Sequence, residues 1–300
     1  MQFLQQMING VTIGAFYVLV ALGYTMVYGV LKLINFAHGD LFMWGAYVGL
    51  TSLTGLLSLV AQGSAWFAVP AVMVVMVTVA IVGVLVERIA YRPLRDAGRL
   101  APVISALGVA FILQSLARNI YGASYKTYPQ DVVLSGGFRL GSARVSMMQL
   151  VVLFISFMLM AVLYLFVQLT RIGTAMRAVS LNHDVSLLMG IDVDRIIAIV
   201  FLIGPGLGGV AGIIVALYYG SFDFTVGWIF GLKAFIAAIL GGIGNIPGAM
   251  LGGMLLGVVE TLGAGYLSPQ WKDVIAYLIL ILILIFRPTG ILGERVAEKV

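Results

Sequence analysis

Few residues of this chain can carry chemistry, and they are widely separated. The 300-residue sequence contains no Cys and only two His, and His38 and His183 lie in different polar segments without paired carboxylates beside them. A thiolate or histidine cluster for metal binding is therefore not available, and cysteine catalysis is impossible. No nucleophile, base and orienting group come together either. We predict no catalytic residues, no metal site, no cofactor and no enzymatic activity.

One short motif matches a nucleotide-binding fingerprint in spacing alone. Residues 204–209 read GPGLGG, which fits GxGxxG, but they lie inside an apolar stretch with no strand before them. Glycines recur every four residues at 204–212 and again at 244–252, a spacing that favours close packing of helices in lipid. No GxxxxGK[ST] phosphate loop occurs, so any ATP that drives this protein must bind to another chain.

The composition defines the elements that must position these residues. Apolar residues make up 62% of the chain and charged residues 10%, far from the values of soluble globular domains. Asp, Glu, Lys and Arg are entirely missing from residues 1–31, 41–86, 145–170, 196–222 and 234–259. Each of these runs can span about 30 Å of hydrocarbon as a helix, whereas the strands of a membrane barrel would alternate apolar and polar residues. We predict an all-α polytopic membrane protein in which residues 1–300 form a single transmembrane domain.

Apolar length, with Gly, Pro and charge as punctuation, predicts eight spans. They lie near 8–30, 41–61, 67–86, 100–117, 146–169, 196–219, 246–262 and 272–286. The stretch 229–241 is also apolar but corresponds to only about 20 Å of helix. It is either a half-helix or a strongly adapted span, so the predicted count is eight to nine transmembrane helices.

Basic residues predict the orientation of the chain. Lys and Arg gather in the segments 87–99, 171–195 and 287–299, which the positive-inside rule places in the cytoplasm. The N-terminus is then external and the C-terminus cytoplasmic. Segment 118–145 disagrees, because it must be external although its basic residues outnumber Asp131. The net charge of +5 thus serves to orient the chain, and we predict no nucleic-acid partner.

Two ionisable residues stand in otherwise apolar segments. Lys233 lies near the start of 229–241, and Glu260 lies near the outer end of the next span. A charge at membrane depth is costly, so Lys233 either marks a substrate path or extends its ammonium group to the outer interface. A Lys233–Glu260 pair between neighbouring helices is a further hypothesis.

Two polar breaks interrupt the apolar pattern. Asn35, His38 and Asp40 separate the first two spans, either as a turn with Asp40 as the helix cap or as a half-open helix that lines a cavity. Segment 241–247, which contains Asn245, is either a discontinuous element or an ordinary Gly-Pro loop. Together with Lys233 and Glu260, we take Asn35, His38 and Asn245 as the candidate lining of a translocation path.

The most polar segment, 170–195, is predicted to form a short cytoplasmic helix followed by a Gly turn. Asp184-Val-Ser186, then Gly190, then Val200 and Leu202, match the spacing of the coupling motif of ABC importer permeases, with Asp in place of Glu and Ile203 in place of Pro. Such a helix and turn can lie in a groove of an ATPase and carry its motion into the spans, and Gly permits the unusual backbone angles of the turn. From spacing alone, a merely solvated loop helix is equally compatible.

Six segments together resemble one known family. These are NGVTIGAFYVLVALGYTMVYGV (9–30), INFAHGDLFMWGAY (34–47), ERIAYRPLR (87–95), LLMGIDVDRIIA (187–198), GLKAFIAAILGGIGNIPGAMLGG (231–253) and RPTGILG (287–293). They are similar to the LivH-type permease subunits of branched-chain amino acid ABC importers, and the similarity covers essentially the whole chain.

The resemblance implies a function and a set of partners. It implies import of Leu, Ile and Val across a bacterial inner membrane, with a second, LivM-like permease, two ABC ATPase subunits and a periplasmic substrate-binding protein. It also favours Arg177, Asp184, Ser186 and Gly190 as an ATPase-coupling loop. Urea or short amides remain alternative substrates, and a secondary amino acid transporter remains an alternative class, although the spans contain almost no ionisable residues for ion coupling. Arg139 and Arg144 of the external loop are expected to meet acidic residues on the binding protein.

Overall fold

The computed structural model describes residues 2–59, 68–95, 97–98, 100–129, 136–141 and 143–293. Its longer α-helices are α1 (Gln2–Leu31), α2 (His38–Leu59), α3 (Ala68–Val86), α4 (Leu100–Tyr121), α5 (Met147–Leu169), α8 (Val193–Tyr219), α9 (Val226–Gly241), α10 (Ile246–Tyr266) and α11 (Trp271–Phe286). Short helical segments are the π-helical η2 (Glu87–Tyr91), the 3-10 helix η3 (Arg92–Leu94), α6 (Arg171–Leu181) and α7 (His183–Leu188). Four short strands are β1 (Lys126–Thr127), β2 (Gly137–Leu140), β3 (Ala143–Ser146) and β4 (Ser221–Phe222). Arg99, Arg295 and Lys299, which belong to the basic segments 87–99 and 287–299, lie outside the described residues, as does Asp131 of segment 118–145.

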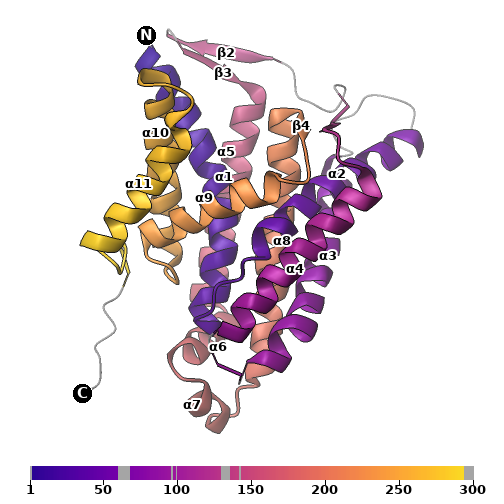
Figure 1. Cartoon of the computed structure of the whole chain (residues 1–300), viewed down its shortest axis with the longest axis vertical. Helices are drawn as coiled ribbons and strands as arrows, with labels where there is room; N and C mark the ends of the chain where they lie inside the picture. Colours follow the sequence, from indigo (N-terminus) through magenta and orange to yellow (C-terminus); the bar gives the residue numbers. More distant parts are fainter. Residues whose placement is uncertain are drawn as a thin grey trace.

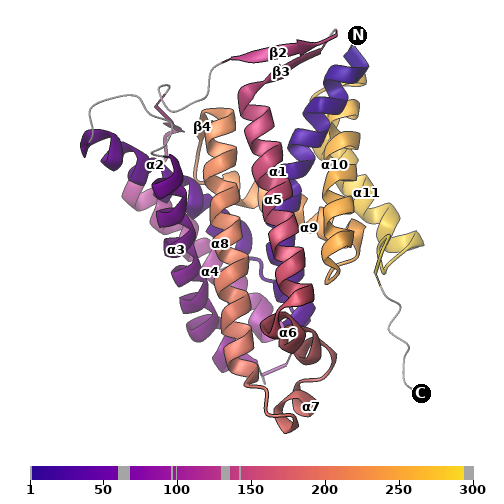
Figure 2. The ribbon, with the colours of Figure 1, turned by 180° about the vertical axis from the view of Figure 1, so that it is seen from behind.

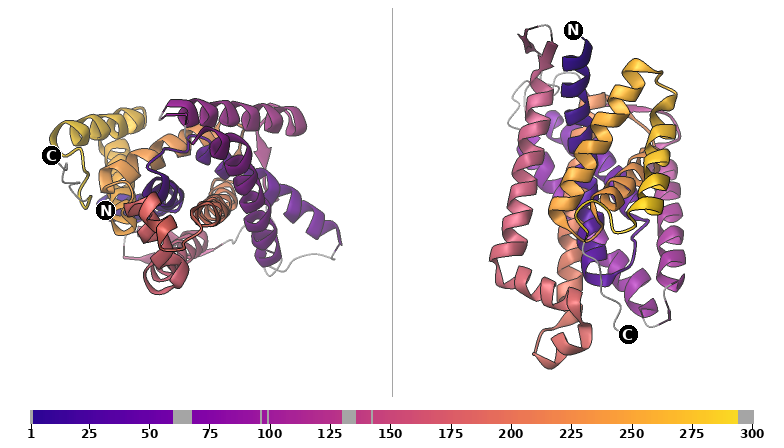
Figure 3. Two further views of the ribbon diagram at one scale, coloured as in Figure 1. Left: turned by 90° about the horizontal axis from the view of Figure 1, so that it is seen from below. Right: turned by 90° about the vertical axis from the view of Figure 1, so that its left-hand side faces the viewer.

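Helices α1 and α8 form the centre of the bundle, as the end-on view in Figure 3 shows. Most of both helices is buried, whereas α3, α4 and α5 keep apolar side chains on an outward face. Helix α1 packs against α10 over much of its length. There Gly10 and Gly14 leave no room for a Cβ against the α10 backbone at Val258 and Met254. The close packing expected at the glycines of 204–212 and 244–252 is confirmed in part. Gly212 of α8 and Gly252 of α10 lie directly against the backbones of α2 and α9, whereas Gly244 lies in the loop before α10 with a φ of 96°.

The predicted number of spans is not confirmed. Six segments of the described chain are long and apolar enough to cross a membrane, namely α1, residues 69–94, α4, α5, α8 and α10. Both α9 and α11 have 16 residues. At about 1.5 Å per residue such a helix is roughly 24 Å long, which is shorter than the hydrocarbon layer. In Figure 1, α9 runs obliquely between α8 and α10.

The two ends of the bundle carry different polar structures. The β2–β3 hairpin lies beside the start of α1 at one end, and α6 and α7 lie at the other (Figures 1 and 2). Gln5 fixes the hairpin, because its amide donates to the Arg144 carbonyl at 3.1 Å and accepts from the Arg144 N–H at 2.8 Å. The described residues of segment 118–145 and the segment 170–195 therefore lie at opposite ends, as the alternation of spans predicted.

Local chemistry sets several helix ends. Ser146 and Gln149 form a capping box that starts α5 directly after β3. Asp192 accepts from the Arg195 N–H at the start of α8, and Gly220 ends α8 with a φ of 73°, a left-handed angle that favours glycine. These contacts fix the residue at which α5 begins and the residues at which α8 begins and ends.

Candidate translocation pathway and coupling loop

Lys233 and Glu260 form an ion pair inside the bundle, so the predicted pairing is confirmed. The Lys233 Nζ lies 2.6 Å from Oε1 of Glu260 and 2.8 Å from Oδ1 of Asp273. The Tyr17 hydroxyl donates to the other oxygen of Glu260 at 2.7 Å. This network, called the buried ion network below, joins α1, α9, α10 and α11. Tyr17 and Asp273 were not predicted, because nothing in the sequence shows that four helices meet there.

Burial indicates what the buried ion network does. Lys233 is 8% exposed and Glu260 is 2% exposed, so each depends on its partner for compensation of its charge. The Asp273 side chain is 66% exposed, and it ties the network to the surface of α11. The buried ion network therefore holds α1, α9, α10 and α11 together. A role of Lys233 and Glu260 in lining a path remains a prediction.

The break between α1 and α2 is a buried turn. Lys32 has a φ of 55°, and the His38 N–H donates to the Asn35 carbonyl at 3.1 Å as α2 begins. Asp40 does not act as the predicted helix cap, because its carboxylate accepts from the Gln114 amide of α4 at 2.9 Å. The Asn35 side chain accepts from the Tyr91 hydroxyl at 3.0 Å. Both side chains therefore join the turn to other elements, a role that spacing along the chain does not reveal.

His38 fills a slot between the two central helices. It is fully buried, and its ring lies edge-on to the Tyr24 ring at 4.9 Å. A Cβ at Gly23 of α1 would overlap the imidazole, and one at Gly208 of α8 would lie 3.2 Å from it. His38 is thus closely packed at the α1–α8 contact, and its place in a translocation path remains a prediction.

Segment 241–247 forms a capped Gly-rich loop. Asn245 is the N-cap of α10, accepting from the Gly248 N–H at 3.0 Å, and its amide donates to the Leu292 carbonyl at 2.9 Å. Gly242 has a φ of 108° and packs against the backbone of Gly293. The segments GGIGNIP and RPTGILG, which are far apart in sequence, therefore pack together. This favours the ordinary-loop interpretation of 241–247 and gives Asn245 a structural role.

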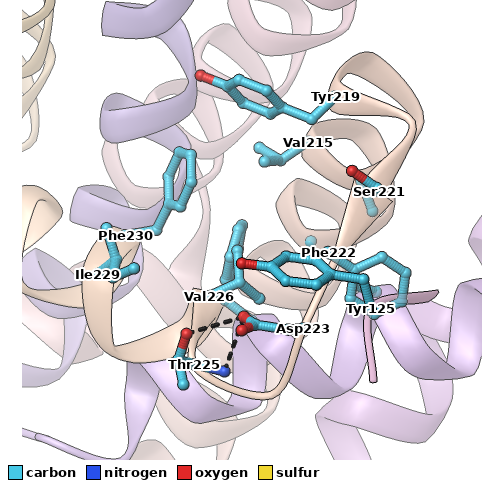
Figure 4. A pocket seen from close by; sticks show the side chains of 14 residues that line it. Tyr125, Val215, Tyr219, Ser221, Phe222, Asp223, Thr225, Val226, Ile229 and Phe230 are labelled. Carbon is cyan, nitrogen blue, oxygen red and sulfur yellow. Dashed lines mark hydrogen bonds between the residues drawn. The ribbon is translucent and has the colours of Figure 1, made fainter. Parts of the chain in front are cut away.

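A cavity of about 250 Å³ lies between α2, α8 and α9 at the hairpin end of the bundle. Figure 4 shows its lining, with Tyr219, Asp223 and Phe230 among the labelled side chains. No residue that lines this cavity was predicted as part of a translocation path. Its described lining residues come from α2, from the second half of α8, from β4 through the start of α9 and from Tyr125 before β1, and only Asp223 among them is charged. The GSFDF stretch at 220–224, a polar interruption between two apolar runs, was the available signal.

The coupling-loop segment contains two short helices where one was predicted. Asn182 ends α6 and caps α7 by accepting from the Val185 N–H at 3.1 Å, and this cap separates the two helices. Gly190 has a φ of 80°, which confirms the predicted Gly turn. Leu188 at the end of α7 and its C-cap residue Met189 are 86% and 77% exposed, so this end of the helix presents apolar side chains outward.

The four predicted coupling residues differ in their surroundings. Asp184 is exposed, whereas Ser186 is buried and donates to the Asn182 carbonyl at 2.8 Å. Arg177 turns back onto α5, where its guanidinium donates to the Val167 carbonyl. Ser186 and Arg177 therefore hold the loop in shape, while Asp184 and Gly190 lie where another chain can reach them.

Besides the Arg177 contact with α5, polar contacts connect the loop and the start of α8 to other parts of the bundle. The His183 ring lies within hydrogen-bond distance of the Val30 carbonyl of α1, at 3.0 Å. At the start of α8, Asp194 pairs with Arg92 and Arg95, and Arg95 also lies 3.0 Å from Glu87. A displacement of α7 can therefore reach α1 directly and α3 through the first turn of α8.

Comparison with known proteins identifies the family. Residues 6–284 match the model described as "Branched-chain amino acid transport system / permease component". The chain belongs to this permease family.

Full-length relatives agree with this assignment. The permease is 43% identical to the high-affinity branched-chain amino acid transport system permease protein BraD of Pseudomonas aeruginosa, over 99% of this chain and 98% of that protein. It is 42% identical to LivH of Escherichia coli K12, with the same coverage of both chains. A more distant relative, a probable LivM permease of Methanocaldococcus jannaschii, is 28% identical over 59% of this chain and 54% of its own length. No solved structure matches the permease.

Proposed function

We propose that this permease is the subunit of a bacterial ABC importer that moves Leu, Ile and Val across the inner membrane. The observation that carries the proposal is the 42–43% identity to BraD and LivH over nearly the whole of both chains, since both names specify high-affinity branched-chain amino acid transport. ATP would be hydrolysed by two separate ATPase subunits. A second, LivM-like permease would complete the pathway, with residues 1–300 acting as one membrane domain.

The α6–α7 segment is the proposed contact with the ATPase. Its exposed Leu188 and Met189 stand on a short capped helix, and Asp184 and Gly190 lie on the same segment. Closure of the ATPase dimer would displace this helix, and the contacts of His183 with α1 and of Asp194 with the α3 side would pass the displacement into the bundle. This arrangement requires the α6–α7 end to be cytoplasmic and the N-terminus to be periplasmic.

The β2–β3 hairpin is the proposed docking element for the periplasmic binding protein. Arg139 and Arg144 are exposed and directly opposite each other in the hairpin. Like charges in that position repel, so an acidic partner surface would relieve the repulsion and gain two charge pairs. The anchoring of the hairpin by Gln5 gives the partner a fixed element to bind.

Co-purification and uptake test the proposal together. The permease would be expressed with the other transport subunits, isolated in mild detergent and reconstituted into liposomes containing ATP. We expect two ATPases and a second permease to co-purify, and leucine uptake to require both ATP and the binding protein. Recovery of the chain alone, with leucine uptake that needs no ATP, would identify a secondary transporter. Uptake of urea but not leucine would favour the short-amide alternative.

A variant on α7 locates the coupling surface. Replacing the 86% exposed Leu188 by Ser should reduce recovery of the ATPase but not of the second permease. The matched control is Leu267→Ser, a 70% exposed leucine at the end of α10 near the opposite end of the bundle. Equal ATPase recovery for the two variants would argue against α7 as the contact.

A further inference from the structure

We propose that the cavity between α2, α8 and α9 is a binding site for the transported amino acid, in which Asp223 binds the ammonium group and the apolar wall holds the branched side chain. The inference rests on the proposed import of branched-chain amino acids and names where this chain would bind them. No residue of this cavity was among the predicted path residues.

The size of the cavity fits a small amino acid. Its volume is about 250 Å³. Pockets for drug-sized ligands are larger, at about 300–1,000 Å³. One leucine, isoleucine or valine molecule is therefore an appropriate occupant.

The wall of the cavity is mostly apolar and aromatic. Phe42, Val215, Ile229 and Phe230 contribute to it from three helices. The Phe42 and Phe230 rings stack with centroids 5.4 Å apart, which gives the wall a fixed shape. Burial of an aliphatic side chain against such a surface contributes about 25 cal/mol per Å². A hydrophilic side chain of similar size would lose its hydration there without compensation.

Asp223 is suited to an ammonium group. It is the one charged residue among the described residues that line the cavity. Its Oδ1 accepts from the Thr225 N–H at 3.1 Å and from the Thr225 hydroxyl at 2.8 Å, as the dashed lines in Figure 4 show. These two bonds fix the orientation of the carboxylate. Within the described part of the chain no hydrogen bond engages Oδ2, which leaves it to accept from a ligand.

Hydroxyl groups provide donors for the carboxylate of the same ligand. Tyr125 and Ser221 both line the cavity and are both exposed. The antiparallel pairing of β1 with β4 sets Thr127 opposite Ser221 and holds the segment after Tyr125 against the cavity. Tyr128 strengthens this attachment, because its buried hydroxyl donates to the Ala46 carbonyl of α2 at 2.7 Å. The site therefore has one charged acceptor and nearby neutral donors, a set that matches a zwitterion better than an anion.

The cavity also adjoins the buried ion network. The Phe230 ring lies 5.9 Å from the ring of Tyr17, whose hydroxyl donates to Glu260. Phe230 thus lines the cavity on one side and packs against Tyr17 of the buried ion network on the other. A ligand that displaces Phe230 would act on the contact between these helices, which is a direct route from substrate binding to helix movement.

Protection from alkylation tests the site, because the chain has no native Cys. A Ser221→Cys variant introduces one thiol at the cavity, and a Ser268→Cys variant introduces one in the α10–α11 connection as the matched control. Each is assembled with its partner subunits, and the rate of maleimide labelling of this chain is measured with and without millimolar leucine. The same measurement uses 3-methylbutylamine, which lacks the carboxylate of leucine, and 4-methylpentanoate, which lacks the ammonium group.

We expect leucine to slow labelling at position 221 several-fold and to leave position 268 unchanged. The amine should protect and 4-methylpentanoate should not. Adding Asp223→Asn should raise the leucine concentration for half-protection about tenfold or more, because a hydrogen bond to a charged group is lost. The Asn side-chain oxygen can still accept both bonds from Thr225, so the local fold is kept.

The outcomes separate this inference from the proposed function. Labelling at position 221 that ignores leucine, in a complex whose wild type imports leucine with ATP, would overturn the cavity site and leave the importer function standing. Protection by 4-methylpentanoate equal to that by leucine would overturn the role of Asp223. Failure of the wild-type complex to import any branched-chain amino acid would overturn the proposed function and, with it, this inference.

Discussion

Removal of the Lys233 charge is the perturbation whose effect the structure defines most sharply. In Lys233→Met, Glu260 keeps the Tyr17 hydrogen bond but loses the cation 2.6 Å from its Oε1. Because Glu260 is 2% exposed, water cannot replace that cation. Breaking a buried pair on one side costs about 3–5 kcal/mol. We therefore expect Lys233→Met to destabilise the permease strongly.

A double variant separates the lost charge from the lost side chain. In Lys233→Met with Glu260→Gln no charge is left buried, and the Asp273 side chain is 66% exposed and remains solvated. Replacing both members of a buried pair is often close to neutral. The double variant should therefore recover most of the stability that the single variant loses.

Thermal stability of the purified complex measures both effects. At roughly 2–4 °C per kcal/mol, the single variant should lower the midpoint by on the order of 10 °C. Lys272→Met is the matched control, because Lys272 neighbours Asp273 on α11 and forms no ion pair among the described residues. If the single variant is as stable as this control, or the double variant is no more stable than the single variant, the stabilising role of the buried ion network is refuted. If folded Lys233→Met complexes still import leucine at the wild-type rate, the assignment of Lys233 to the path is wrong.

Two further predictions concern helix packing and partner docking. Gly212→Ala should lower the stability of the permease by pushing α2 from α8, because the new Cβ would overlap the Phe42 carbonyl. The control is Gly108→Ala on α4, which has open space around it and should leave stability unchanged. Equal thermal midpoints for the two variants would contradict this prediction. Reversing Arg139 and Arg144 to Glu should reduce stimulation of ATP hydrolysis by the binding protein at low salt and leave basal hydrolysis intact, since both residues are exposed on the hairpin. Unchanged stimulation would remove the hairpin from the docking surface.

Local pattern was sufficient for much of the helical architecture. The predicted apolar spans place α1, α4, α5, α8 and α10 close to their observed positions, because a buried or lipid-facing helix must be largely apolar along its length. The same pattern did not predict how many helices cross the membrane. Whether a short helix such as α9 spans or lies obliquely depends on the helices beside it, and its own composition is as apolar as that of a full span.

The candidate site shows the same division. Lys233 and Glu260 could be paired in advance, because two isolated opposite charges in apolar segments have few other ways to be compensated. Asp40 was misassigned as a cap, because its position at a helix start says nothing of Gln114, which lies 74 residues further along the chain. Asn245 caps α10, a role that a Gly-rich loop before Pro also permits, and its assignment to a translocation path stays a prediction.

By itself, the sequence determined that this chain is an α-helical membrane permease, since composition, charge-free runs and six family segments all act along the chain. Tertiary structure alone decided that Tyr17 and Asp273 join the Lys233–Glu260 pair, and that Asp223 faces a cavity walled by α2, α8 and α9. The reason is physical. Hydrophobicity and backbone hydrogen bonding within one helix depend on neighbouring residues, whereas a cavity or a buried ion pair exists only where separate helices bring distant side chains to the same point.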